Sequence, residues 1–149
     1  MNLGTDLLLL RQALEELAAA RRHLDFSATR VSALPADLKG VSDAQLESAE
    51  AYTSRFARTV DLLVNKVLRG IDRVELRPAG TLLDVINSAE QRGLVERAEA
   101  LREMKAMRNE VAHDYAGQRL PEVFAFCRER KVLLDAICDR AAEHARRFR

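Results

Sequence analysis

The sequence predicts an all-α protein, and three observations support this class. Helix-favouring residues are abundant, whereas the 149-residue chain has only six glycines and three prolines. Apolar residues recur at steps of three and four over long stretches, which is the period of an amphipathic helix. No segment stands out with the two-residue alternation of a strand, and no internal repeat is visible. We therefore expect a bundle of about five helices in one domain, residues 1–149, because this length suits a single core.

The first expected helix carries a leucine seam. Six leucines recur at three- and four-residue steps, with Arg21 as the one gap: Leu3, Leu7, Leu10, Leu14, Leu17 and Leu24. The pattern stops over residues 27–40, where Pro35 and Gly40 act as breakers. The seam predicts a helix that packs against another helix.

A second, longer helix is expected to follow. Ser42 caps it, with Gln45 three residues later as a capping box. Its apolar stripe runs from Leu46 to Val74, and we expect Gly70 to bend it or to fray its end. Because the connection between the two long helices is short, they are expected to pack antiparallel.

Three more helices complete the expected bundle. A turn over residues 77–80 precedes a short helix that Thr81 caps and Gly93 ends. A fourth helix is expected to start near Leu94, and a fifth near Pro121. The basic residues 146–149 favour the C-terminal end of the fifth helix through its dipole, with phosphate contact as the alternative.

Charge and cysteine content limit the functional classes. With 24 basic and 23 acidic residues, the net charge of +1 excludes a uniformly basic nucleic-acid surface, although a local basic groove remains open. No apolar run approaches the length of a membrane span, and the start lacks the basic leader of a signal peptide.

Cys127 and Cys138 are eleven residues apart, so on a helix they face the same way, and we expect two buried thiols. A cytoplasmic protein is the expectation.

Residues 108–115 read Arg-Asn-Glu-Val-Ala-His-Asp-Tyr and gather scarce residue types. The chain has three histidines and two tyrosines, and one of each lies in this octapeptide. On a continuing helix, Arg108 and Tyr115 fall on the apolar side, where a guanidinium needs a partner or a cleft. Asn109 and His113 become neighbours, so the amide could orient the imidazole. Arg108 and His113 point about 140° apart, so a kink or a two-fold partner is needed for them to converge.

An arginine and a histidine suit RNA cleavage. The 2′-hydroxyl of RNA is a nucleophile that the substrate already carries; a histidine can move its proton, and an arginine can stabilise charge on the phosphate. This scheme requires no divalent metal and no cofactor. A structural alternative stays open, in which Arg108 pairs with a carboxylate, His113 caps the helix and Tyr115 packs in the core.

Other candidate sites carry less weight. Glu110 and His113 match half of a di-iron bundle site, but the chain has no second Glu-x-x-His. Three arginines could add phosphate contacts, with surface pairing to glutamates as the favoured alternative: Arg55, Arg58 and Arg102. We expect His23 and His144 to be solvated.

The stretch from Gly80 to Leu94, the segment Leu101-Arg102-Glu103-Met104 and the octapeptide together resemble HEPN-domain proteins of the HepT type. The motif R-x4-H-x-Y is intact, and Asn109 follows the arginine as is common in HEPN nucleases. The similarity is clearest over residues 80–115, and the helical layout extends it to nearly the whole chain.

The resemblance implies a homodimeric, metal-independent ribonuclease that acts as a toxin. Arg108 and His113 would be catalytic at the dimer cleft, with Asn109 in support. The implied partner is a MntA-like minimal nucleotidyltransferase antitoxin, which would silence the toxin by transferring AMP from ATP to Tyr115. A second hypothesis is a non-catalytic subunit that binds the nucleotidyltransferase, or a nucleotide, without cutting RNA. A third is a structural helical dimer whose motif forms only an interface network.

Overall fold

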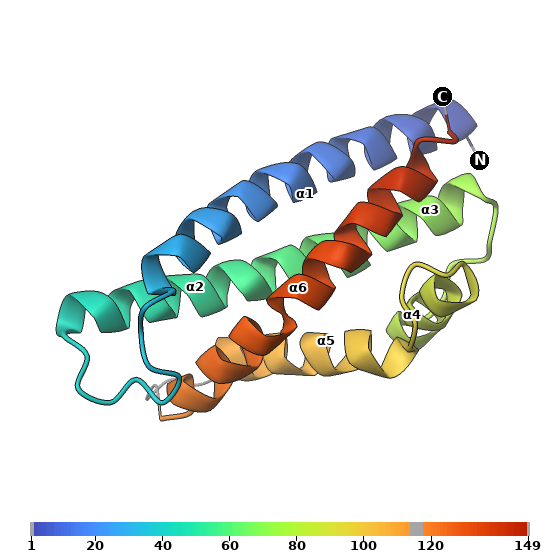
Figure 1. Ribbon diagram of the computed structural model, residues 1–149. Coiled ribbons are helices and arrows are strands. Elements are labelled where there is room, and N and C mark those ends of the chain that lie inside the picture. The colour runs from blue at the N-terminus through green and yellow to red at the C-terminus, as the bar shows by residue number, and fades with distance from the viewer. Residues whose placement is uncertain (1, 114–117, 149) are drawn as a thin grey trace.

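The computed structural model describes residues 2–113 and 118–148, with positions 112 and 113 described as helical backbone only. Within these residues all regular structure is helical and no strand occurs, which confirms the all-α prediction. The helices form five rods (Figure 1). The first is α1 (Leu3–Val31), and the second is continuous and consists of α2 (Asp43–Asp61), the π-helix η1 (Leu62–Leu68) and α3 (Arg69–Val74). The other three are α4 (Leu82–Gln91), α5 (Ala98–His113) and α6 (Leu120–Ala145).

Helix α1 is longer than the leucine seam predicted. The Asn2 side chain caps its start by accepting a hydrogen bond from the Thr5 backbone N–H, at 3.3 Å. Beyond Leu24 the buried positions continue through Ser27 to Val31, so the expected interruption at residue 27 is wrong. The buried Ser27 hydroxyl is satisfied because Arg55 Nη1 donates to it, at 2.8 Å.

The second rod begins as predicted and contains one feature that the sequence did not indicate. Ser42 and Gln45 form the capping box, with both reciprocal hydrogen bonds present. Directly after Asp61 the helix widens into the π-helix, in which each N–H bonds five residues back. Helix α3 then continues past Gly70 to Val74.

Gly70 serves close packing and does not end the helix. A Cβ atom at this position would lie 3.1 Å from Leu10 Cδ1 of α1. The missing side chain therefore lets the two long rods approach each other. They run antiparallel, as predicted, and the start of α1 lies at the same end of the bundle as the end of α6 (Figure 1).

The short helix α4 and the start of α5 meet in a tight turn. Thr81 caps α4 in a box with Asp84. Gly93 has φ +77°, and the Leu94 N–H reaches back to the Ala89 carbonyl at 3.0 Å, which ends the helix in a left-handed cap. Helix α5 starts at Ala98 and not near Leu94, because its first N–H groups are satisfied there: Ala98 N donates to Glu90 Oε2 at 2.5 Å.

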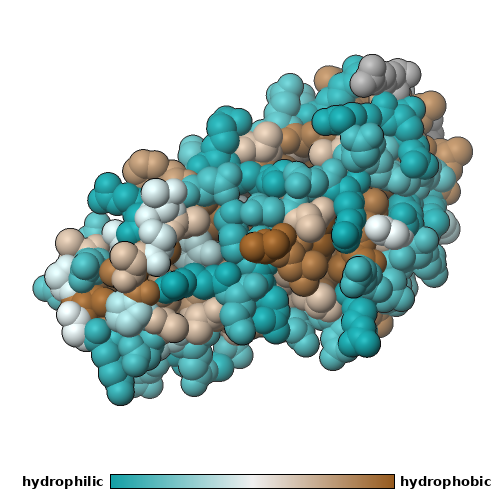
Figure 2. Space-filling view, viewed as in Figure 1, coloured by the Kyte–Doolittle hydropathy of each residue, from teal (hydrophilic) through white to brown (hydrophobic). Residues whose placement is uncertain are grey.

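The core lies along α2 and η1, against which α1, α5 and α6 pack. Tyr52 and Phe124 are fully buried and meet edge to face, with ring centroids 5.8 Å apart. Cys127 and Cys138 are buried free thiols, as predicted, and burial raises the pKa of each to about 12. On the face shown in Figure 2, hydrophilic side chains predominate and hydrophobic ones show between the helices. Within the described residues, no helix is both long and apolar enough to cross a membrane.

Candidate functional site

The last two turns of α5 hold the first part of the octapeptide. Arg108 lies beside the partly buried Met107 and Val111, and its side chain is 37% exposed. Asn109 is exposed, and His113 is the last residue of the helix. Because Arg108 is ion-paired, its guanidinium has the carboxylate partner that the structural alternative expects.

That partner is Asp61, at the end of α2. Its Oδ2 accepts a hydrogen bond from Arg108 Nε at 2.6 Å, and its Oδ1 accepts one from Lys105 Nζ at 2.5 Å. Arg108 and Lys105 are one turn apart on α5, so both reach the same carboxylate. The trio joins α5 to α2 and keeps a net charge of +1.

The hydrogen bond to Arg108 uses only one of its three nitrogens. Nε binds Asp61, while Nη1 and Nη2 have no hydrogen-bond partner among the described residues. Arginine binds carboxylates and phosphates most strongly through two parallel N–H groups. Asp61 thus orients the guanidinium from one side, through Nε.

Asp61 remains ionised at neutral pH. Burial by itself would raise the pKa of this carboxyl, but the hydrogen bonds and charges of Lys105 and Arg108 outweigh burial and hold the pKa below its usual value. Arg108 therefore faces a permanent negative charge.

The π-helix places Asp61 at a change of helical register. Asp61 is the last residue before the i→i+5 segment, whose inner positions Leu63, Val64 and Val67 are fully buried. Short π segments inside α-helices often occur at functional sites. Asp61 is not among the residues predicted from the sequence, where its only signal is a lone acidic residue at the edge of an apolar stripe.

Glu110 joins the end of α5 to the start of α6. Its Oε2 lies 2.6 Å from Arg119 Nη1, and Arg119 also pairs with Glu122 at 2.9 Å. Glu110 is therefore engaged by a cation. In the searched part of the chain, residues 2–113 and 118–148, no group of three potential metal ligands gathers.

Part of the predicted site lies outside what the structure describes. Tyr115 falls in the segment 114–117, and of His113 only the backbone is described. The predicted convergence of Arg108 and His113, the support from Asn109 and the role of Tyr115 therefore stay predictions.

The expected pairing of three further arginines with glutamates is not found among the described residues, and one histidine also differs from expectation. Arg55 forms no ion pair there; its Nη1 donates to the His23 carbonyl at 3.0 Å and to Ser27, so it ties α2 to α1. His144, expected to be solvated, is buried, and its Nε2 lies 3.0 Å from Glu75 Oε2. His23 is exposed, as predicted. Arg58 and Arg102 are exposed and form no ion pair with any residue of the described ranges.

Comparisons of the chain with protein-family models, with curated proteins and with solved structures find no match.

Proposed function

We propose that this protein is a metal-independent endoribonuclease of the HEPN type, acting as the toxin of a pair whose antitoxin is a minimal nucleotidyltransferase. The observation that carries the proposal is the Arg108 guanidinium, which is oriented by Asp61 and keeps both Nη groups unengaged among the described residues. The intact R-x4-H-x-Y motif and the all-helical frame support it.

The chemistry is transfer of a phosphoryl group within the RNA. The substrate 2′-oxygen forms a bond to the adjacent phosphorus as the bond from phosphorus to the 5′-oxygen breaks, which leaves a cyclic phosphate. His113 takes the 2′-hydroxyl proton or protonates the departing 5′-oxygen. Arg108 Nη1 and Nη2 bind the phosphate oxygens as negative charge grows on them. Asp61 is a positioning residue, because it acts only through Arg108.

Two copies of the chain are needed in this proposal. On an ideal helix Arg108 and His113 point about 140° apart, so one chain brings them together poorly. A two-fold axis beside the end of α5 would set Arg108 of one subunit near His113 of the other. Tyr115, two residues after His113, would be the AMP acceptor through which the partner silences the site.

The test is RNA cleavage by purified protein in the presence of EDTA. Wild type is expected to cut a structured RNA, whereas Arg108→Gln and His113→Ala lose activity at least about 100-fold, as is common when a charge-stabilising or proton-transfer group is removed. Arg11→Gln is the matched control, because Arg11 is an exposed arginine on α1 and has no part in the proposed site. Equal cleavage by wild type and His113→Ala would overturn the proposal. No cleavage by wild type, together with tight binding to the nucleotidyltransferase, would favour the non-catalytic subunit.

A further inference from the structure

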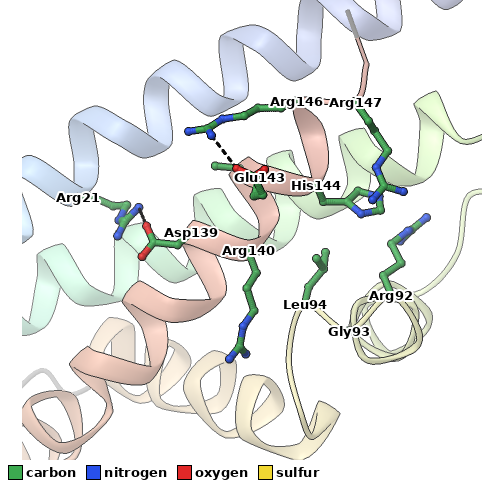
Figure 3. A pocket seen from close by; sticks show the side chains of 11 residues that line it. Arg21, Arg92, Gly93, Leu94, Asp139, Arg140, Glu143, His144, Arg146 and Arg147 are labelled. Carbon is green, nitrogen blue, oxygen red and sulfur yellow. Dashed lines mark hydrogen bonds and ion pairs between the residues drawn. The ribbon is translucent and has the colours of Figure 1, made fainter.

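A broad hollow lies between the last turns of α6 and the turn of residues 92–94 that leads from α4 toward α5 (Figure 3). Its volume is about 1000 Å³, and we call it the α6 groove. Among its lining residues are five arginines: Arg21, Arg92, Arg140, Arg146 and Arg147. The α6 groove is therefore a local basic surface on a chain whose net charge is only +1.

The two carboxylates in the α6 groove do not neutralise it. Asp139 accepts a hydrogen bond from Arg21 at 2.9 Å, and Glu143 accepts one from Arg146 at 2.6 Å. Arg140 and Arg147 are exposed and have no ion pair within the described part of the chain. The described residues thus leave two positive charges of this surface without an ion-pair partner.

Arg140 and Arg147 both line the α6 groove. Arg140 is in α6, whereas Arg147 lies two residues beyond Ala145, where the helix ends. In Figure 3, Arg147 extends toward Arg92, and Arg140 extends from α6 toward α5. Since both exposed guanidiniums line one groove, one anionic ligand can contact both.

Arg92 forms a fixed wall of the α6 groove. Its Nη1 donates to Asp72 and its Nε to Glu75, each at 2.6 Å, and its side chain is only 4% exposed. The remaining nitrogen, Nη2, is buried without a hydrogen-bond partner among the described residues.

We propose that the α6 groove binds phosphate groups, and that its ligand is the phosphodiester backbone of single-stranded RNA. The groove is lined by residues 92–94, which precede α5, and Arg108 lies about 15 Å along that helix from its first residue, Ala98, at 1.5 Å per residue. It is therefore a second contact region, separate from Arg108. Phosphate binding here does not depend on RNA cleavage, whereas the assignment to RNA rests on the proposed function.

The first arm of the test measures RNA binding without cleavage. A labelled 2′-O-methyl RNA is used, because blocking the 2′-oxygen prevents cutting, and fluorescence anisotropy is recorded at several salt concentrations. Arg140→Gln/Arg147→Gln is expected to weaken binding and to reduce the slope of log K against log salt by about 1.4, at 0.7 for each lost contact to a single strand.

Arg11→Gln/Arg22→Gln is the matched control, because it removes the same charge from exposed positions on α1 that do not line the groove. The control is expected to keep the wild-type slope. Equal slopes in the groove variant and the control would overturn the proposal.

The second arm separates a polymer from a free nucleotide by calorimetric titration with ATP. If the groove variant loses RNA binding and ATP affinity does not change, the ligand is the RNA backbone. If it loses only ATP binding, the groove still binds phosphate but the RNA assignment is overturned. Failure of the wild type to cut unmodified RNA would overturn the proposed function and leave these binding results standing.

Discussion

Arg108 combines two properties that a surface ion pair does not usually combine. Its position is fixed from one side by a carboxylate that is itself shared with Lys105. Its two terminal nitrogens are uncommitted among the described residues, and its side chain is partly exposed. A guanidinium held in this way loses little freedom when it binds an anion, so more of its interaction energy reaches the bound state.

Replacing Asp61 tests the positioning role. In Asp61→Asn the charge that orients Arg108 is lost, and we expect kcat for RNA cleavage to fall by about 10- to 100-fold, because small misplacements of a catalytic group have effects of this size. KM should change less than kcat. Asp61→Glu keeps the carboxylate and should restore part of kcat. If Asp61 had only a structural role, kcat would not depend selectively on this charge.

The control for this variant is Asp25→Asn, which removes another carboxylate paired with a lysine, Lys131, far from Arg108 in the chain. Melting curves by circular dichroism show whether each variant is folded. Wild-type kcat in folded Asp61→Asn would remove Asp61 from the account.

Tyr115 carries a separate prediction at the same scale. Incubation of the wild type with ATP and the partner nucleotidyltransferase should add the mass of AMP, because the phenolic oxygen is the expected acceptor. Tyr115→Phe should show no added mass. The other tyrosine, Tyr52, is buried in the core and is therefore not an accessible acceptor. Unchanged labelling of Tyr115→Phe in intact mass spectrometry would contradict the role of Tyr115 and leave the cleavage chemistry untouched.

At the scale of the elements, a charge network joins α3 to α6 and to the residue that ends α4. Glu75, which follows α3, accepts from Arg92 at 2.6 Å and lies 3.0 Å from His144 of α6. Burial by itself would raise the pKa of Glu75, but Arg92 and His144 outweigh burial and lower it from its ordinary value of 4.5. A carboxyl with a lowered folded-state pKa stabilises the fold above its unfolded pKa, and this stabilisation is lost as the pH falls through the folded pKa.

The acid sensitivity of the fold should therefore depend on Glu75. We expect Glu75→Gln to have a lower free energy of unfolding than wild type at pH 7, with the difference shrinking as the pH falls below about 4.5. Urea unfolding at a series of pH values between 7 and 3 measures this. Glu143→Gln, at an exposed carboxylate paired with Arg146, should leave the curve nearly unchanged. A constant difference between wild type and Glu75→Gln at all pH values would refute the linkage.

For the whole molecule, the proposal requires a site shared between two subunits. Arg108→Gln and His113→Ala are each expected to be inactive. After mixing and subunit exchange, half of the dimers are mixed, and in each of these one of the two shared sites has both groups intact. Activity should therefore return to about a quarter of wild type in a two-fold symmetric dimer.

The alternative geometry gives a different result in the same experiment. If Arg108 and His113 act within one chain, every site in a mixed dimer lacks one group and no activity returns. Light scattering shows the oligomeric state, and a variant carrying both substitutions, mixed with wild type, controls for simple dilution. No recovery despite proven exchange would sink the shared site.

Local sequence patterns predict the helical class, the starts of α2, α4 and α6, and the burial of both cysteines. These features depend on residues that are close in the chain. Apolar side chains recur every three or four residues, and capping residues such as Ser42 and Thr81 bind backbone groups within one turn. The continuation of α1 to Val31 was missed, because Ser27 is a polar residue whose burial depends on Arg55 from another helix.

Which charged groups contact each other depends on the tertiary structure. Asp61 and Arg108 are 47 residues apart, and Glu75 and His144 are 69 apart. Such pairs depend on how whole helices pack and on the change of register at the π-helix, which no local spacing reports. The octapeptide marks where the candidate site lies, but the carboxylate that orients its arginine and the basic groove at the far end of α5 come from packing alone.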